Sequence, residues 1–237
     1  MTGHSFTDIL YIQLLPVMVD TYLHHGGIVS KSKTPAVAAI LLAAGKSERM
    51  GENKLLLPFG KRLIIQRTLD NLIASRAQTV IVVLGSRAAE INEVIGQRNV
   101  TTVFNPNYAY GMNTSLAAGI KTVENHVKFI LVALGDQPLV TTQTYDTLIA
   151  TAMCTDKGIL VPTYAGKRGN PIVLSIGYRT ALLGLSGDIG GRELLRAYSG
   201  DVLEVPVEDK GIIININTYV EYEKQLKNSS EEAGGDG

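Results

Sequence analysis

The chain has 237 residues, and its 22 Lys plus Arg balance 22 Asp plus Glu, so the formal net charge at pH 7 is zero. This balance argues against a protein that binds nucleic acid through bulk charge. Hydrophobic residues make up 45% of the chain, which excludes a largely disordered protein. The single cysteine, Cys154, excludes an internal disulfide and a cysteine-rich zinc site, and it indicates a reducing compartment such as the cytoplasm.

The two ends of the chain differ in composition from the rest. Residues 1–34 are expected to be an N-terminal extension outside the main fold, either an amphipathic segment or a stretch upstream of an internal start at Met18. The apolar run at 9–19 contains Gln13 and Pro16, so it is too short and too broken to span a bilayer. Residues 228–237 consist largely of Ser, Glu, Gly and Asp and are predicted to be a disordered tail. We therefore expect no membrane partner.

Residues 35–227 predict one domain of the α/β class. In chain order, buried strands are expected at 36–43, 79–84, 100–104 and 129–134. Helices are expected at 63–75, 87–95, 113–123 and 142–153, the third with Asn113 or Thr114 as its N-cap. This alternation predicts a doubly wound, mostly parallel sheet with helices on both faces.

After Gly158 the alternation of strands and helices becomes less regular. Strands are expected at 159–162, 171–174, 202–205 and 212–216, and helices at 192–197 and 220–226. Because no linker rich in Pro or Ser intervenes, these elements are assigned to the same domain, with a small β subregion on the substrate side near 157–178.

Residues 42–54 (LAAGKSERMGENK) directly follow the first predicted strand, where phosphates bind in open α/β sheets. Its small residues, which let backbone N–H groups approach an anion, are Ala43, Ala44, Gly45 and Gly51. Its cations are Lys46, Arg49 and Lys54. The segment matches neither the P-loop nor the dinucleotide fingerprint. The residues alone support a phosphate-binding loop and a solvated basic loop, paired with Glu48 and Glu52, about equally.

A second segment, residues 134–140 (LGDQPLV), follows the predicted strand at 129–134. Asp136 is expected at the carboxyl edge of the sheet. A carboxylate there suits Mg²⁺, which combines one or two carboxylates with substrate phosphates and water. The alternative is an aspartate that caps the turn before Pro138.

Together the two segments resemble the MobA-like nucleotidyltransferases, and within that family the molybdenum cofactor cytidylyltransferases most. Further segments with the family's pattern are NPNYAYGMNTSLAAG at 105–119, GNPIVL at 169–174, GDIGGRELL at 187–195 and NINT at 215–218. They occur in the family's order over residues 35–224. The resemblance implies a Rossmann-like nucleotidyltransferase fold and an enzyme that joins a nucleoside triphosphate to a phosphorylated acceptor and releases pyrophosphate.

For this chain the resemblance implies transfer of CMP from CTP to the terminal phosphate of molybdopterin, with Mg²⁺ as cofactor. The implied catalytic residues are Lys54 at the α-phosphate, Arg49 at the leaving pyrophosphate and Asp136 at the metal. The implied nucleotide-binding residues are Leu42, Ala43, Ala44, Gly45, Lys46, Ser47, Arg49, Lys54, Asn105 and Ser115.

The remaining implied sites concern the metal and the acceptor. The second metal ligand is Asn217, or Asn215 in the alternative register. Asp188 and Arg192 are expected to bind the acceptor, or Asp188 caps the helix that contains Arg192.

Two features bear on the choice of nucleotide. Asn215 and Asn217 stand where many cytidylyltransferases have aspartate, a pattern more like the guanylyltransferase branch. Against this, the first loop reads LAAG and not the LAGG of guanine users. The Ala44 methyl group narrows the space beside the base, which favours the smaller pyrimidine. We therefore expect CTP in preference to GTP.

Three alternatives remain at this point. The first is transfer of a nucleotide to a sugar phosphate or phospho-alcohol on the same fold. The second is an NAD(P)H-dependent reductase, although hydride transfer requires neither Lys54 nor Asp136. The third is a chaperone that only carries the cofactor, although Lys54, Arg49 and Asp136 are all present. Expected partners are CTP or GTP, a molybdopterin-type acceptor and a recipient molybdoenzyme or its chaperone, but no nucleic acid.

Overall fold

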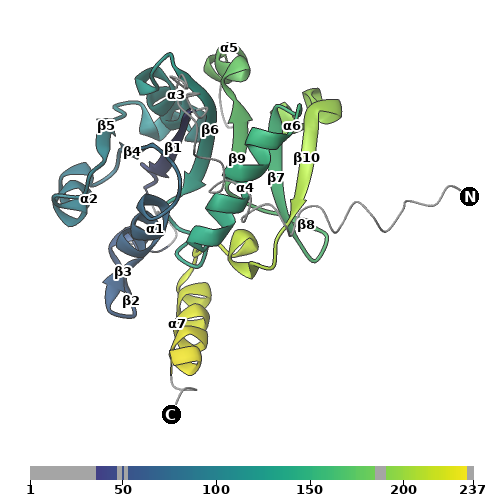
Figure 1. The fold of residues 1–237 in the computed structure, drawn as a ribbon. Helices are drawn as coiled ribbons and strands as arrows, with labels where there is room; N and C mark the ends of the chain where they lie inside the picture. Colours follow the sequence, from purple (N-terminus) through teal and green to yellow (C-terminus); the bar gives the residue numbers. More distant parts are fainter. Residues whose placement is uncertain (1–35, 47–49, 51–52, 185–190, 234–237) are drawn as a thin grey trace, which may run out of the picture. The chain divides into compact units, whose positions relative to one another are not determined.

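The computed structural model describes residues 36–46, 50, 53–184 and 191–233, with side chains excepted at 191–192 and 229–233 (Figure 1). The extension predicted at 1–34 lies outside these residues and stays a prediction.

The described residues build an eight-stranded, mostly parallel sheet, which confirms the predicted fold class (Figure 1). The order of strands is β10 (Val202–Pro206), β7 (Ile159–Tyr164), β9 (Ile172–Ser175), β6 (Val127–Leu134), β1 (Ala36–Ala43), β4 (Thr79–Leu84) and β5 (Thr101–Phe104), and β8 (Lys167–Arg168) pairs with β7. Strand β9 is antiparallel to both β6 and β7, so the region predicted as a substrate-side addition is part of the main sheet.

Strand β1 lies at the centre of the sheet because its sequence, AVAAILLA, presents apolar side chains to both faces. It pairs in parallel with β4 and β6, and its last residues match the last residues of both neighbours. Leu42 lies opposite Leu134, and Ala43 lies opposite Leu84. The carboxyl ends of all three strands therefore open at the same edge of the sheet, which is where the site described below is found.

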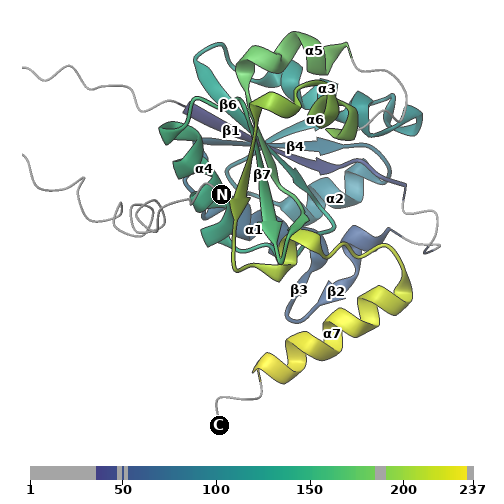
Figure 2. The same cartoon turned by 90° about the vertical axis from the view of Figure 1, so that its right-hand side faces the viewer.

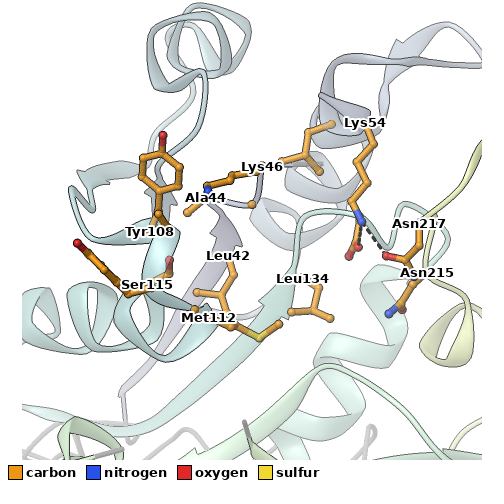
Figure 3. Close-up of a pocket in the computed structure, with 16 residues that line it drawn as sticks. Leu42, Ala44, Lys46, Lys54, Tyr108, Met112, Ser115, Leu134, Asn215 and Asn217 are labelled. Atoms are coloured by element: carbon orange, nitrogen blue, oxygen red, sulfur yellow. Dashed lines mark hydrogen bonds and ion pairs between the residues drawn. The ribbon is translucent and has the colours of Figure 1, made fainter. Parts of the chain in front are cut away.

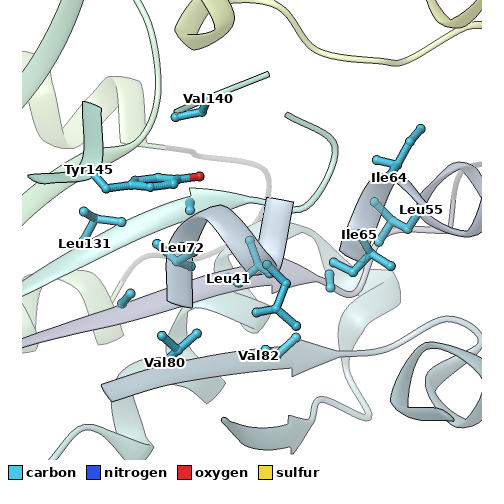
Figure 4. Close-up of a cluster of buried hydrophobic side chains, with 14 of the residues drawn as sticks. Leu41, Leu55, Ile64, Ile65, Leu72, Val80, Val82, Leu131, Val140 and Tyr145 are labelled. Atoms are coloured by element: carbon cyan, nitrogen blue, oxygen red, sulfur yellow. The ribbon is translucent and has the colours of Figure 1, made fainter. Parts of the chain in front are cut away.

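Helices cover both faces of the sheet (Figures 1 and 2). Helices α1 (Ile64–Ile73), α2 (Ala88–Ile95) and α4 (Thr142–Cys154) pack on one face, in a cluster that includes Leu41, Leu72, Leu131 and Tyr145 (Figure 4). Helices α3 (Met112–Thr122), α5 (Arg179–Leu183) and α6 (Gly191–Ala197) pack on the other, against Ile40 and its neighbours. Short 3-10 turns are η3 (Lys54–Leu56), η4 (Tyr108–Tyr110), η5 (Ile176–Tyr178), η6 (Ser199–Asp201) and η7 (Lys210–Ile213).

Helix α3 begins earlier than predicted, and its predicted N-cap was wrong. The helix starts at Met112, and the N-cap is Gly111, whose φ of 110° lies in a region that glycine adopts without strain. The Thr114 hydroxyl instead donates to the carbonyl oxygens of Asn107, at 2.8 Å, and Gly111, at 2.9 Å. Because η4 leads directly into the helix, the turn rather than a capping side chain sets where the helix begins.

The strand predicted at 212–216 is absent from the described chain, which forms η7 and an irregular segment there. A Cβ atom on Gly211 would lie 2.4 Å from the Leu139 carbonyl oxygen, so only glycine fits at this position in the turn. The Ile212 carbonyl accepts hydrogen bonds from the Asn170 backbone N–H, at 3.0 Å, and the Gln137 side chain, at 3.1 Å. These loop contacts occupy the polar groups that a strand would offer to a neighbour.

The last helix, α7 (Tyr219–Ala233), lies beside a hairpin of β2 (Pro58–Phe59) and β3 (Arg62–Leu63) (Figure 2). The Tyr222 hydroxyl donates to the Pro58 carbonyl at 2.5 Å. The helix continues through 228–233, where we predicted disorder, because Glu and Ala there are strong helix formers. Residues 234–237 lie outside the described part. Among the described helices, none is long and apolar enough to cross a bilayer.

Candidate active site

A cleft of about 730 Å³ opens at the carboxyl ends of β1 and β6 (Figure 3). Five segments of the chain line it: the end of β1 with the loop that follows, η3, the η4–α3 corner, the end of β6 with Asp136, and the segment after η7. The predicted site residues in this lining are Leu42, Ala44, Gly45, Lys46, Lys54, Ser115, Asp136 and Asn217. The cleft therefore brings together residues from most of the predicted set.

The remaining predicted residues are placed differently. Ala43 is buried in the hydrophobic cluster on the α1 side of the sheet, so its backbone, not its side chain, is closest to the cleft. Ser47, Arg49 and Asp188 lie outside the described residues, as does the side chain of Arg192. Their predicted contacts stay predictions.

Lys54 lies at one end of the cleft and connects two polar residues from distant segments (Figure 3). Its Nζ is 2.5 Å from Asp136 Oδ2 and 2.9 Å from Asn217 Oδ1. The side chains of Lys54 and Asp136 are only 16% and 15% exposed. Local structure supports this arrangement, because the Asn53 carbonyl oxygen Oδ1 accepts from the Leu55 N–H at 3.1 Å and caps η3, and Leu55 packs into the core.

Asn215 and Asn217 lie on one segment beside Asp136, but their side chains have different partners. The Ile216 N–H donates to the Asp136 carbonyl oxygen at 3.1 Å, which holds the two segments side by side. Asn215 turns its Oδ1 to Gln137 Nε2 at 2.5 Å, whereas Asn217 turns its Oδ1 to Lys54. Sequence analysis assigned no role to Gln137, although it directly follows Asp136 in the GDQP motif.

The oxygens at this end of the cleft fit a small divalent cation in type. Carboxylate and amide oxygens are the hard ligands that Mg²⁺ takes, and Asp136 and Asn217 offer one of each. Among the described residues no group of three His, Cys, Asp or Glu side chains could hold a metal. A cation here would therefore complete its coordination with substrate phosphates and water.

The opposite end of the cleft is formed by Tyr108, Met112 and Ser115 (Figure 3). Tyr110 also lines the cleft. Tyr110 and Met112 are 75% and 55% exposed, which is unusual for large apolar side chains. The end of β4 comes close to Tyr108, since a Cβ atom on Gly85 would lie 2.6 Å from Tyr108 Cβ. Sequence analysis gave Met112 no role in the site, because an apolar side chain carries no chemical signal by itself.

Asn105 lies behind this end of the cleft and is not part of its described lining. It is 3% exposed, and its Nδ2 donates to Ser115 Oγ at 3.0 Å and to Thr114 Oγ1 at 2.8 Å. Its Oδ1 accepts from the Asn107 N–H at 3.0 Å. These bonds hold η4 against the start of α3, so in this structure Asn105 positions Ser115.

A second cavity, of about 640 Å³, adjoins the first and shares Leu42, Met112 and Leu134 with it. Part of its other lining is apolar and buried: Leu116, Val132, Val161, Leu174, Leu182 and Leu194. Polar groups also line it, among them Asn113, Asn170 and Glu193. The segments at 169–174 and 187–195, singled out in the sequence for their motifs, both contribute described residues to this cavity.

Comparisons with known proteins agree with this geometry. Residues 39–202 match the model of the MobA-like NTP transferase domain. The chain is 30% identical over 184 residues to molybdenum cofactor cytidylyltransferase of Escherichia coli strain K12, covering 77% of this chain and 92% of that protein. It is 31% identical over 173 residues to nicotine blue oxidoreductase of Paenarthrobacter nicotinovorans, covering 68% of this chain and 82% of that protein.

A solved structure is also similar. The manganese complex of Rv0371C from Mycobacterium tuberculosis H37Rv superposes with a TM-score of 0.71 at 26% identity, covering 81% of this chain and 98% of that one. The family match spans most of the described domain, and the most informative sequence segments lie within or beside it. The chain therefore belongs to the MobA-like NTP transferase family, and it is a nucleotidyltransferase.

Proposed function

We propose that this nucleotidyltransferase transfers CMP from CTP to the terminal phosphate of a molybdopterin-type acceptor and releases pyrophosphate, with Mg²⁺ as cofactor. The observation that carries the proposal is the group of Lys54, Asp136 and Asn217 in a cleft at the carboxyl edge of the sheet, with a second cavity adjoining that cleft. The similar Escherichia coli protein is a molybdenum cofactor cytidylyltransferase, which supports this acceptor.

The nucleotide occupies the first cleft. Its base lies toward Tyr108 and Ser115, and its phosphates lie along Gly45 and Lys46 toward Lys54. Ala44 supports CTP over GTP, because it is 4% exposed and its methyl group takes part of the space that a glycine would leave for a purine. Arg49 is proposed to bind the β- and γ-phosphates through its planar guanidinium.

In the reaction, a phosphate oxygen of the acceptor forms a bond to the α-phosphorus of CTP while the bond from that phosphorus to the β-phosphate oxygen breaks, and pyrophosphate leaves. Lys54 neutralises the negative charge that builds on the α-phosphate. Asp136 and Asn217 hold Mg²⁺, which when bound neutralises charge on the nucleotide phosphates. The manganese complex of the similar mycobacterial structure supports a divalent cation in this family.

The acceptor occupies the second cavity, with its phosphate toward the shared wall at Leu42 and Leu134. Apolar walls suit a flat fused ring better than a sugar, whose hydroxyl groups would lose water without gaining hydrogen-bond partners. Asn113 and Asn170 line this cavity and are proposed to face the polar edge of such a ring. Asp188 and Arg192 are proposed as further acceptor contacts, and a recipient molybdoenzyme or its chaperone as the partner that takes the product.

Ligand-dependent melting temperatures test the nucleotide assignment. The purified protein is heated with CTP, GTP, ATP, UTP or NADPH, each with and without Mg²⁺. We expect CTP with Mg²⁺ to stabilise it most, because a ligand that binds only the native state raises its melting temperature. Ala44→Gly is the matched variant and should raise the shift with GTP while leaving that with CTP nearly unchanged. A shift with GTP equal to that with CTP in the unmodified protein would contradict the cytidylyl assignment.

Release of pyrophosphate from CTP tests the acceptor. We expect release with molybdopterin and none with a sugar phosphate or a phospho-alcohol. Release with the sugar phosphate alone would show that the second cavity accepts a different substrate, and stabilisation by NADPH without any transfer would favour a reductase.

A further inference from the structure

The Lys54 ammonium already contacts both oxygens that the proposed function assigns to the cation. Nζ lies 2.5 Å from Asp136 Oδ2 and 2.9 Å from Asn217 Oδ1. We propose that Lys54 is a resident counter-ion of this site, so that the divalent cation binds tightly only after a nucleotide has drawn the lysine away. The inference rests on the proposed function for the identity of the two ligands.

Distances show that the ammonium and a metal ion on the same oxygens would repel each other. Mg²⁺ binds oxygen at about 2.1 Å, so an ion on Asp136 Oδ2 would lie within about 4.6 Å of Nζ as placed here. Two positive charges at that separation repel each other where water is largely excluded, and both side chains are mostly buried. We therefore expect a metal that binds these oxygens in the free protein to displace Lys54 from its only ion-pair partner among the described residues.

The charges in the cleft point to the nucleotide as the trigger. Asp136 is the one carboxylate in the described lining, and a single carboxylate cannot neutralise two cations. A triphosphate brings the missing negative charge and offers the ammonium a new partner. Lys54 can follow because it carries its charge on a flexible four-carbon stem, while its backbone in η3 is held by the Asn53 cap.

Cooperative binding follows from this arrangement. If the nucleotide raises the affinity for the metal, the metal raises the affinity for the nucleotide by the same factor. The free protein would thus carry a neutral ion pair in place of a bare metal site, and the complete set of charges would form only when both ligands are present.

Binding of Mn²⁺, followed by the electron paramagnetic resonance signal of the free ion, tests the proposal with the full chain. Lys54→Met removes the charge but keeps much of the length of the side chain. We expect this variant without nucleotide to bind Mn²⁺ at least about tenfold more tightly than the unmodified protein, and CTP to improve Mn²⁺ affinity about tenfold only when Lys54 is present.

Lys46→Met is the matched control, since Lys46 lines the same cleft and makes no ion pair with Asp136. It removes the same charge and should leave Mn²⁺ affinity in the absence of nucleotide unchanged. Asp136→Asn should weaken Mn²⁺ binding both in the otherwise unmodified protein and in Lys54→Met.

Equal Mn²⁺ affinity in the unmodified protein and in Lys54→Met, including undetectable binding in both, would overturn the proposal. So would an equal gain in Lys46→Met. The experiment without nucleotide does not depend on the reaction: tighter Mn²⁺ binding in Lys54→Met with no transfer from CTP would contradict the proposed function alone.

Discussion

Two carboxylates flank the same irregular segment but differ in their partners. Asp209 precedes η7, and its Oδ2 accepts from the Thr141 N–H and hydroxyl, both at 2.9 Å, and from the Thr144 hydroxyl at 2.6 Å. Its Oδ1 accepts from the Gly211 N–H at 2.7 Å. Every one of these donors is a neutral group on a rigid element, so Asp209 ties the start of α4 to η7.

Asp136, on the other side of that segment, contacts the charged tip of a long side chain at the wall of a cleft. A carboxylate saturated by short, fixed donors has a structural role, since no ligand can replace those bonds cheaply. A carboxylate paired with one flexible cation can exchange it for a ligand. The contrast separates a residue that holds the fold from one that is available for chemistry, although the amino acid is the same.

The largest effect is expected from Asp136→Ala. Turnover should fall by about 10³-fold or more at any Mg²⁺ concentration, because the carboxylate is the one charged ligand in the described cleft. The melting temperature should stay close to that of the unmodified protein, since the residue lies at the edge of the sheet and its loss opens no core cavity. Pyrophosphate release measures turnover, and calorimetry measures the melting temperature. A fall in stability without a fall in turnover would show that Asp136 has the structural role that we assign to Asp209.

Lys54→Ala should lower kcat by about 10²–10³-fold while the KM for CTP changes much less. The charge of Lys54 is most effective as negative charge builds on the α-phosphate, whereas the rest of the loop still binds the nucleotide. Lys46→Ala, in the same cleft, should mainly raise KM. Steady-state kinetics of both variants decide between this role and a surface ion pair worth at most about 1 kcal/mol; near-normal kcat in Lys54→Ala would contradict the mechanism.

Asn217→Ala should lower kcat by about tenfold, less than Asp136→Ala, because a neutral amide is a weaker partner for Mg²⁺. Asn215→Ala is the control: its Oδ1 is bonded to Gln137, so its loss should change the Mg²⁺ dependence of the rate little. If instead Asn215→Ala changed the Mg²⁺ dependence of the rate and Asn217→Ala did not, Asn215 would be the second metal ligand, as in the alternative register of the NINT segment.

Asp209→Ala should act on stability. Loss of its bonds to Thr141, Thr144 and Gly211 leaves several donors without a partner and should lower the free energy of unfolding by about 2 kcal/mol. Activity per folded molecule should stay within a few-fold of the original. Chemical denaturation combined with kinetics below the melting transition measures both, and a loss of kcat as large as that of Asp136→Ala would remove the distinction between the two carboxylates.

The smallest effect concerns a third carboxylate, Asp201, whose hydrogen-bond donors are neutral like those of Asp209. The Tyr178 hydroxyl donates to its Oδ2, and the Gly158 N–H donates to its Oδ1 at 3.0 Å. These bonds lower the pKa of Asp201 below its ordinary value of 3.8, and burial followed by the same hydrogen bond raises the pKa of Tyr178 to about 12.

Because the pKa of Asp201 is lower in the folded state, its stabilising contribution is present above about pH 4 and is lost as the pH falls through the folded value. Tyr178→Phe should therefore lower stability by about 1 kcal/mol at neutral pH and by less below pH 3. Unfolding curves at both pH values measure the difference, and a loss of the same size at both would show that ring packing, not the carboxylate, is responsible.

Local sequence patterns were enough to predict the framework of the sheet. Strands β1 and β4 have the bounds predicted for them, because short, nearly continuous apolar runs specify buried parallel strands locally. Residues that follow the parallel strands β1 and β6 lie at one edge of the sheet, and Lys54 and Asp136, which the family resemblance assigned to a common site, are in contact there.

The paths of the surrounding segments depend on tertiary contacts. Asn217 contacts Lys54 while Asn215 contacts the Gln137 side chain, and η7 replaces a strand because Gly211 must pass close to the Leu139 carbonyl. The position of Asn105 behind the cleft likewise follows from its bonds to α3. Each of these outcomes depends on a contact between residues distant in the sequence or on a loop's backbone path, and a local pattern of residue types contains no information about either.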